Sequence, residues 1–215
     1  MYDNMQKGIV ICATGSWYDV LSEDGVTRKC RIRGRMRLKG VRSTSPVVVG
    51  DEVLFTEDGE DFVIEELSPR RNYIIRRASN LSKESHIIAA NIDRAMLVVT
   101  LSSPRTAPEF VDRFLITCEA YSIPATILLA KIDLAAECRE QVEEFRSTYE
   151  SAGYEVIEIS ALYGTGLDRV RELVAGRTTL VAGNSGVGKS TLIGALEPAL
   201  DVRTGEISQS HHKGR

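Results

Sequence analysis

The sequence predicts two domains of different classes, an all-β barrel of OB-fold type followed by an α/β domain with a parallel sheet. Five short runs of strand-forming residues, separated by turn residues, fill the first 77 positions. Apolar strand-like runs then alternate with helical patterns, which is typical of a parallel sheet covered by helices. Near the end, residues 179–192 (TLVAGNSGVGKSTL) read as a strand, a glycine-rich loop and the start of a helix.

The first domain, residues 1–77, contains the runs GIVICATG, SWYDVLS, TRKCRIRG, VVVGDEVLF and DFVIEELS. Gly, Asp and Ser residues separate them, including the two EDG turns at Glu23–Gly25 and Glu57–Gly59. Five strands in about 70 residues fit an OB-fold, a small barrel that often binds nucleic acids. An SH3-like barrel fits the spacing almost as well.

The second domain, residues 78–215, follows a basic stretch, SPRRNYIIRRASNLSKES, that we interpret as a linker. Strands are expected at AMLVVTL, ATILLA, YEVIEIS and RTTLVAG. Helices are expected at PEFVDRFLITCEAY, around Val142, Phe145 and Tyr149, and after a capping box of Thr165 and Asp168. This alternation predicts a parallel sheet wrapped by helices.

The glycine-rich loop matches G-x-x-x-x-G-K-[ST], the pattern of a phosphate-binding loop. Its glycines let backbone N–H groups turn toward phosphate oxygens, and the following helix directs its positive end at the same anion. Lys189 is expected to reach the β- and γ-phosphates as the catalytic residue, and the Ser190 hydroxyl to ligate Mg²⁺. The predicted contact residues are Gly183, Asn184, Ser185, Gly186, Val187, Gly188, Lys189, Ser190 and Thr191. The motif does not distinguish ATP from GTP.

Two further motifs favour guanine. The first predicted site, Ala130, Lys131, Ile132 and Asp133, ends one strand, and the second, Ser160 and Ala161, ends the next. The Asp133 carboxylate is suited to accept the N1 and N2 hydrogens of guanine, the Lys131 stem to cover the base, and the Ala161 amide to face O6. Each motif is weak alone, but both lie at strand ends, where doubly wound sheets bind ligands.

The order of these motifs is unusual. In most GTPases the phosphate loop comes first and the base-reading motifs last, whereas here the order is reversed, so the domain is expected to be circularly permuted. This order, the barrel in front, and GNSGVGKST followed by EISQSHHKGR resemble the RsgA (YjeQ) family of small ribosomal subunit biogenesis GTPases. The resemblance extends over essentially the whole chain.

The resemblance implies an N-terminal OB-fold-like barrel, a circularly permuted P-loop GTPase domain, and a monomeric cytoplasmic protein. It implies a role in late maturation of the small (30S) ribosomal subunit, in which the barrel binds 16S rRNA and the nucleotide state controls binding and release. GTP, GDP and Mg²⁺ are the implied cofactors. Lys189 and a Mg²⁺ ion on Ser190 are expected to stabilise charge on the transferring phosphoryl group, and the subunit to stimulate hydrolysis.

Two features depart from the family pattern. Ala130 stands where the family has an asparagine, which predicts weaker or less selective guanine binding. The sequence also has no Asp-x-x-Gly segment, and the family's zinc-binding C-terminal domain is missing, so Zn²⁺ is expected only in that missing domain. We therefore expect a truncated GTPase that binds nucleotide better than it hydrolyses it.

Basic residues are concentrated in the barrel. The eight predicted RNA-binding residues are Arg28, Lys29, Arg31, Arg33, Arg35, Arg37, Lys39 and Arg42, with no acidic residue among them. Such a run favours contacts with a phosphate backbone. The alternative is a solvated face paired with the acidic segment EDGEDFVIEE. A second basic cluster is expected at Arg70, Arg71, Arg76 and Arg77.

The composition argues against a membrane-spanning protein and against a metal-binding role for the cysteines. The chain has 215 residues, a net charge of −3 and 43% hydrophobic residues, with no apolar run near the roughly 20 residues that cross a bilayer. Its four cysteines are scattered and lack metal-ligand spacing. Two other functions stay open: a P-loop ATPase or kinase with a nucleic-acid-binding barrel, and a nucleotide-independent RNA-binding assembly factor.

Overall fold

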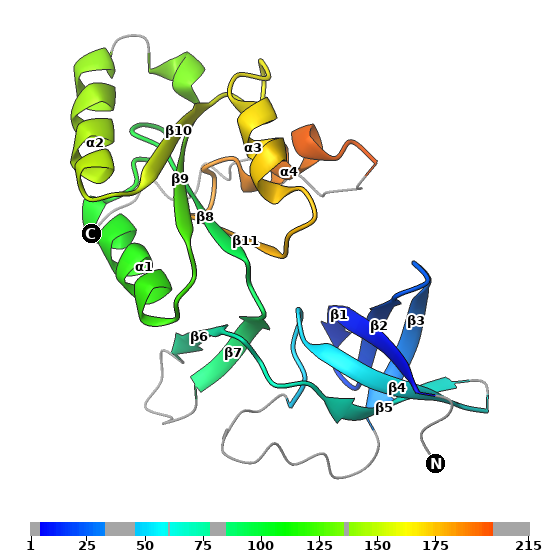
Figure 1. Cartoon of the computed structure of the whole chain (residues 1–215). Coiled ribbons are helices and arrows are strands. Elements are labelled where there is room, and N and C mark those ends of the chain that lie inside the picture. The colour runs from blue at the N-terminus through cyan, green and yellow to red at the C-terminus, as the bar shows by residue number, and fades with distance from the viewer. Residues whose placement is uncertain (1–4, 33–45, 60, 78–84, 136–137, 200–215) are drawn as a thin grey trace, which may run out of the picture. The chain divides into compact units, whose positions relative to one another are not determined.

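The computed structural model describes residues 5–32, 46–59, 61–77, 85–135 and 138–199 (Figure 1). The chain divides into two compact units, Met1–Asp93 and Arg94–Arg215. The division falls after the end of the expected linker and not at residue 77. The domain boundary between residues 77 and 78 stays a prediction.

The first unit contains a closed five-stranded barrel. Its strands are β1 (Gln6–Thr14), β2 (Trp17–Ser22), β3 (Thr27–Ile32), β4 (Glu52–Asp58) and β5 (Asp61–Leu67). They pair in the order β1-β2-β3-β5-β4, and β4 closes the barrel against β1. Strands β3 and β5 run parallel, whereas the other neighbours are antiparallel. The predicted OB-fold-like barrel is therefore confirmed.

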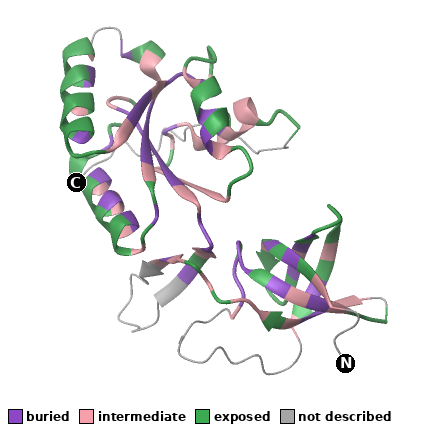
Figure 2. Ribbon diagram, viewed as in Figure 1, coloured by how far each residue is buried: buried purple, intermediate pink, exposed green. Residues whose placement is uncertain are grey.

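Alternating side chains fill the barrel. Val10, Tyr18, Val20, Cys30 and Phe55 are buried in one cluster, and their neighbours along each strand are more exposed (Figure 2). This period of two is what a sheet with one buried face requires. Burial also raises the pKa of the Cys30 thiol to about 11, so this cysteine behaves as a small apolar core residue.

A hairpin of β6 (Tyr73–Arg77) and β7 (Ser85–Ala90) stands where a linker was expected. The apolar residues of this segment form a small core: Ile87 and Ala90 pack with Val48 from the barrel sequence. A parallel bridge between Val49 and Ala89 adds backbone pairing. The linker interpretation was wrong because the flanking arginines suggested a solvated segment, whereas the apolar run Tyr73, Ile74 and Ile75 between them belongs to β6.

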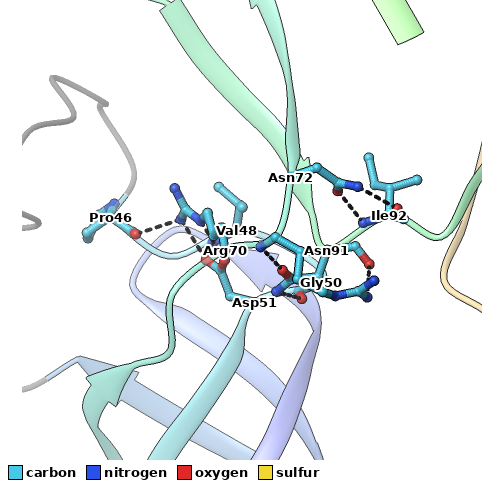
Figure 3. A network of polar contacts seen from close by, with 9 residues as sticks. Pro46, Val48, Gly50, Asp51, Arg70, Asn72, Asn91 and Ile92 are labelled. Carbon is cyan, nitrogen blue, oxygen red and sulfur yellow. Dashed lines mark hydrogen bonds and ion pairs between the residues drawn. The ribbon is translucent and has the colours of Figure 1, made fainter. Parts of the chain in front are cut away.

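Polar contacts hold the base of this hairpin (Figure 3). The Arg70 guanidinium donates to both oxygens of Asp51, over 2.6 and 2.7 Å, and to the Pro46 carbonyl over 3.1 Å. The Arg70 side chain is 9% exposed and that of Asp51 0%. Asp51 also accepts the Val48 N–H, over 2.8 Å. Arg70 is thus a buried structural cation and not part of the predicted second basic cluster.

Two asparagines complete the contacts in Figure 3. Asn72 exchanges side-chain hydrogen bonds of 2.8 Å with both the N–H and the carbonyl of Ile92. The Asn91 amide donates to the Gly50 carbonyl over 2.9 Å. Gly50 has a φ of +89°, and a Cβ there would lie 2.0 Å from the Ala90 carbonyl oxygen, so this close approach requires glycine.

The second unit is an α/β domain. Its elements are β8 (Arg94–Val99), α1 (Pro108–Ala120), β9 (Ala125–Ala130), the 3₁₀ turn η1 (Ile132–Leu134), α2 (Arg139–Ser151), β10 (Glu155–Ile159), α3 (Leu167–Val174), β11 (Thr179–Ala182) and α4 (Lys189–Leu196). The strands are all parallel, in the order β10-β9-β8-β11. This confirms the alternation expected from the sequence.

Helices cover both faces of this sheet (Figure 1). On β8, Met96 and Val98 face a core completed by α3 and α4, whereas Leu97 and Val99 face one completed by α1 and α2. Because both faces are buried, β8 and β9 are almost continuously apolar. Within the described residues, we find no helix with the length and apolar character needed to cross a membrane.

The start of α3 differs from the expectation. The residue before the helix is Gly166, in a left-handed conformation with φ +71°, and no side chain caps the helix. Asp168 instead pairs with Arg171 over 2.8 Å. The predicted capping box of Thr165 and Asp168 was therefore wrong. Glycine is needed at this position because a Cβ on Gly166 would lie 2.3 Å from the Glu158 carbonyl oxygen.

Candidate nucleotide-binding site

The glycine-rich loop connects β11 to α4. Gly183, Gly186 and Gly188 all have positive φ, at +146°, +81° and +103°. A Cβ on Gly183 would lie 2.4 Å from the Val98 carbonyl oxygen, so the loop can pass β8 this closely only with glycine. Val187 is fully buried and anchors the loop in the core under α3 and α4. The loop is a backbone cradle at the positive end of a helix, which suits an anion.

Lys189 begins α4, and its side chain turns back over the loop. The ammonium donates to the carbonyls of Gly183 and Asn184, over 2.8 and 2.7 Å. Ser190 is half-buried in the first turn of the helix, as is Asn184 in the loop, whereas Ser185 and Thr191 are exposed. A lysine cation, a hydroxyl and first-turn N–H groups are thus gathered at one point. These groups fit a polyphosphate with a hard cation such as Mg²⁺.

The structure brings together the two motifs expected to read the base. Ser160 ends β10 and is buried, and its hydroxyl donates to Asp133 Oδ1 over 2.6 Å. Asp133 lies in η1, immediately after β9, and its carboxylate is exposed. Ala161 follows Ser160 and is half-buried. An oriented carboxylate therefore lies at the edge of the sheet where β9 and β10 end.

Lys131 connects this region to the phosphate loop. Its ammonium donates to the Gly186 carbonyl over 2.8 Å and to the Ser103 carbonyl over 2.6 Å. The residue itself has a left-handed backbone, with φ +58°. Ser103 could not be predicted from the sequence, because it accepts this hydrogen bond through its backbone carbonyl and every residue type has one.

The neighbours of Lys131 are apolar. Ala130 is half-buried and packs against the core under α3 and α4, and Ile132 packs against the core under α1 and α2. Ala130 offers no side-chain amide, so the described link from the base-reading motif to the phosphate loop runs through Lys131.

The predicted RNA-binding stretch is described only in part. Arg33, Arg35, Arg37, Lys39 and Arg42 lie outside the described residues. Arg28 forms a two-pronged ion pair with Asp24, at 2.9 and 2.7 Å, and its guanidinium lies 5.6 Å from the Phe62 ring centre.

The rest of the described stretch includes one more paired residue. Arg31 pairs with Asp58 at 3.3 Å and with Asp61 at 3.8 Å, whereas Lys29 is exposed. Arg31 thus makes the pairing with the acidic segment that was left open as the alternative, whereas Arg28 pairs with Asp24 outside that segment. RNA binding by this stretch stays a prediction.

The remaining members of the expected second basic cluster also lie in the first unit. Arg71 pairs with Asp93 over 2.9 Å and donates to the Asn91 carbonyl over 3.2 Å. Arg76 and Arg77 are in β6. Of the described residues, none form a group of three or more His, Cys, Asp or Glu side chains able to hold a metal ion.

Family models match most of the chain. The RsgA GTPase model matches residues 67–215, and the RsgA N-terminal domain model matches residues 7–62. Together they span the barrel and the α/β unit.

Individual relatives agree with these matches. The small ribosomal subunit biogenesis GTPase RsgA of Bacteroides fragilis is 52% identical over 211 residues, which are 97% of this chain and 68% of that protein. The protein of the same name from Christiangramia forsetii is 49% identical over 214 residues, again 97% and 68% of the two chains.

Two solved structures are also similar. YjeQ from Thermotoga maritima is 31% identical, with a TM-score of 0.75 over 94% of this chain and 68% of that one. YloQ, described as a circularly permuted GTPase, is 29% identical, with a TM-score of 0.70 over 92% and 66%. In this chain, too, the base-reading motifs precede the phosphate loop. The sequence, the fold and the order of the motifs agree: the chain belongs to the RsgA GTPase family.

Proposed function

We propose that this chain binds GTP and GDP at the carboxyl edge of its parallel sheet and acts in biogenesis of the small ribosomal subunit. One observation carries the nucleotide proposal. The Ser160 hydroxyl orients the Asp133 carboxylate over 2.6 Å, while Lys131 joins the same loop to the phosphate loop over 2.8 Å. Base-reading and phosphate-binding groups therefore form one connected site.

Each group has a distinct task in base recognition. The Asp133 carboxylate accepts hydrogen bonds from N1–H and the 2-amino group of guanine, which adenine cannot offer in that arrangement. The Ser160 hydroxyl occupies one lone pair of Oδ1 and leaves the others for the base. The Ala161 N–H donates to O6, and the Lys131 stem covers one face of the purine.

The phosphate loop supplies electrostatic catalysis. Lys189 exchanges its carbonyl partners on Gly183 and Asn184 for β- and γ-phosphate oxygens. Ser190 would hold Mg²⁺, which would neutralise charge on those phosphates. The loop N–H groups and the start of α4 stabilise the charge that develops as the γ-phosphoryl group leaves. No described side chain is assigned as a general base.

The ribosomal role rests on the relatives, which are named for small ribosomal subunit biogenesis. In this proposal the barrel binds 16S rRNA through its basic stretch, and the nucleotide state controls how tightly the protein holds the subunit. The protein acts as a monomer in the cytoplasm. Of the described residues of this stretch, exposed Lys29 is the one proposed to contact a phosphate, since Arg28 and Arg31 already have carboxylate partners.

Calorimetric titration with GDP and with ADP, both with Mg²⁺, tests the nucleotide proposal. We expect a clear preference for GDP. Asp133→Asn should reverse the preference between GDP and xanthosine diphosphate, because an asparagine amide can donate to the O2 of xanthine where the carboxylate accepted from the 2-amino group. Equal binding of GDP and ADP by the unaltered chain would instead support a P-loop ATPase or kinase.

Co-sedimentation with purified small subunits tests the ribosomal proposal. We expect binding to depend on whether GDP or a non-hydrolysable GTP analogue is present, and Lys189→Ala to abolish that dependence. If Lys189→Ala binds the subunit as tightly as the unaltered chain, and neither protein responds to nucleotide, the protein is better explained as an RNA-binding factor that does not use its phosphate loop.

A further inference from the structure

The residues that follow β8 form a closed loop, Thr100–Thr106. The Thr106 N–H donates to the Thr100 carbonyl over 2.8 Å, and the Thr100 N–H donates to Thr106 Oγ1 over 3.1 Å. The Thr100 hydroxyl also donates to the Pro104 carbonyl. Both threonines are buried, at 1% and 5% exposure, whereas the residues between them are half-buried or exposed. Two buried threonines therefore fix the shape of a surface loop.

The tip of this loop contacts Lys131. Ser103 has a φ of +44°, which is uncommon for a residue with a side chain, and its carbonyl accepts the Lys131 ammonium over 2.6 Å. Lys131 is itself left-handed, with φ +58°. Two neighbouring residues in sparsely populated conformations persist only where surrounding contacts hold them. Such positions are concentrated at ligand sites.

The same ammonium also reaches the phosphate loop. A lysine has three N–H donors, and two of those on Lys131 go to the Ser103 and Gly186 carbonyls. These carbonyls belong to loops 83 positions apart in the numbering of the chain, after β8 and after β11. A free lysine side chain is among the most flexible, so holding it in advance lowers the ordering cost when a ligand binds.

We propose that the Thr100–Thr106 loop is a positioning element of the nucleotide site. It fixes the Lys131 ammonium against Gly186 and thereby preorganises both the phosphate loop and the lysine stem that covers the base. Thr100 and Thr106 act through Lys131 and are positioning residues. The inference rests on the proposed function, since it assigns a role within the same site.

This role predicts a loss of affinity without a loss of base selectivity. Asp133 reads the 2-amino group of guanine, whereas Lys131 contacts no group that differs between guanine and hypoxanthine. Thr106→Val removes the acceptor for the Thr100 N–H at nearly constant volume. It should weaken GDP and inosine diphosphate binding by the same factor, about tenfold, which is the size of one hydrogen bond to a charged group.

Matched variants separate this effect from general damage. Thr106→Ser keeps the hydroxyl and should restore GDP affinity to within about twofold of the unaltered chain. Thr148→Val makes the same chemical change on the exposed face of α2, outside the loop, and should leave GDP affinity unchanged. In a Lys131→Met background, Thr106→Val should have little further effect, because the contact through which it acts is already lost.

Amide hydrogen exchange provides a second readout if Thr106→Val does not fold. Lys131→Met keeps the apolar stem and removes the ammonium, so the amides of residues 101–103 and 105 should exchange faster in this variant. The inference is overturned if amide exchange is unchanged in Lys131→Met. It is also overturned if Thr106→Val binds both nucleotides as tightly as the unaltered chain does. Absence of GDP preference in the unaltered chain overturns the proposed function as well, so the two failures are distinguishable.

Discussion

At the scale of single residues, Ala130 is the position where one side chain should change nucleotide affinity most directly. It ends β9, one residue before the lysine that contacts the phosphate loop, and it is half-buried. Ala130→Asn should strengthen GDP binding by about 1–3 kcal/mol, because its amide adds hydrogen bonds to the base and to the neighbouring loop. Calorimetry with GDP and ADP measures the change.

The control for this prediction is Ala130→Leu, which adds similar volume without an amide. It should fail to strengthen GDP binding. If the leucine variant gained as much affinity as the asparagine variant, packing and not hydrogen bonding would explain the effect. An unaltered GDP affinity in Ala130→Asn would show that the missing asparagine does not limit guanine binding in this chain.

A second residue-scale prediction concerns the pH response of the barrel. The bonds from Arg28 and from the Val26 N–H hold the pKa of Asp24 well below its ordinary value, at about 2. A carboxyl group with a lowered pKa stabilises the fold above about pH 4, and this contribution is lost as the pH falls from about 4 to about 2. NMR titration of the Asp24 carboxyl should therefore give a midpoint near 2.

Arg28→Gln should raise that midpoint toward the ordinary value of about 3.9, but not fully, since the Val26 N–H still donates. The matched control is Lys29→Gln, which removes the adjacent exposed cation and should leave the midpoint unchanged. A midpoint near 4 in the unaltered chain would mean that Arg28 is free of Asp24 in solution and available for phosphate contacts.

At the scale of elements, the β6–β7 hairpin depends on the buried pair of Arg70 and Asp51. Removing one partner leaves a buried charge without compensation, so Asp51→Ala should lower the free energy of unfolding by about 3–5 kcal/mol. Asp93→Ala breaks the more exposed ion pair with Arg71 and should cost about 1 kcal/mol or less. Urea denaturation of both variants measures the difference.

The double variant Asp51→Leu, Arg70→Met distinguishes charge from packing. It removes both charges and keeps apolar volume, so it should be more stable than either single substitution. A double variant as unstable as the sum of the two single variants would show that the hydrogen bonds to Pro46 and Val48 matter more than the ion pair.

The same hairpin is an element that could not be predicted from the sequence. Strands β8 and β9 could be predicted because a sheet buried on both faces needs continuous apolar runs. The hairpin could not, since its arginines suggested a solvated linker and the Asp51 that neutralises Arg70 lies 19 residues away. The start of α3 was misread because backbone crowding at Gly166, and not a side-chain cap, determines it.

At the scale of the whole molecule, the position of each motif at the end of a strand was enough to predict that the motifs lie at one edge of the sheet. Parallel strands place their carboxyl ends at one edge, so motifs after β9, β10 and β11 converge whatever their order along the chain. The contact geometry could not be predicted from these positions: the Ser160 hydroxyl donates to Asp133, and Lys131 lies between the Ser103 and Gly186 carbonyls. These contacts depend on positive φ angles at Ser103 and Lys131, and a positive φ can be expected from residue type only at glycine.

The division of the chain after Asp93 predicts how two N-terminal fragments should differ in stability. A fragment of residues 1–93 keeps the whole hairpin, whereas a fragment of residues 1–77 loses β7, the buried Ile87 and Ala90, and the Asn91 bond to Gly50. The longer fragment should unfold cooperatively and be more stable by at least about 3 kcal/mol, the contribution of one large buried side chain and one hydrogen bond. Circular dichroism with urea measures both.

The two fragments contain the same five barrel strands, so the comparison isolates the hairpin. Equal stability would mean that the barrel folds without β7 and that the boundary after residue 77 is the physical one. A less stable or unfolded shorter fragment would place the hairpin in the barrel's folding unit, because Arg71 and Asn72 then need their partners at Asn91 and Ile92.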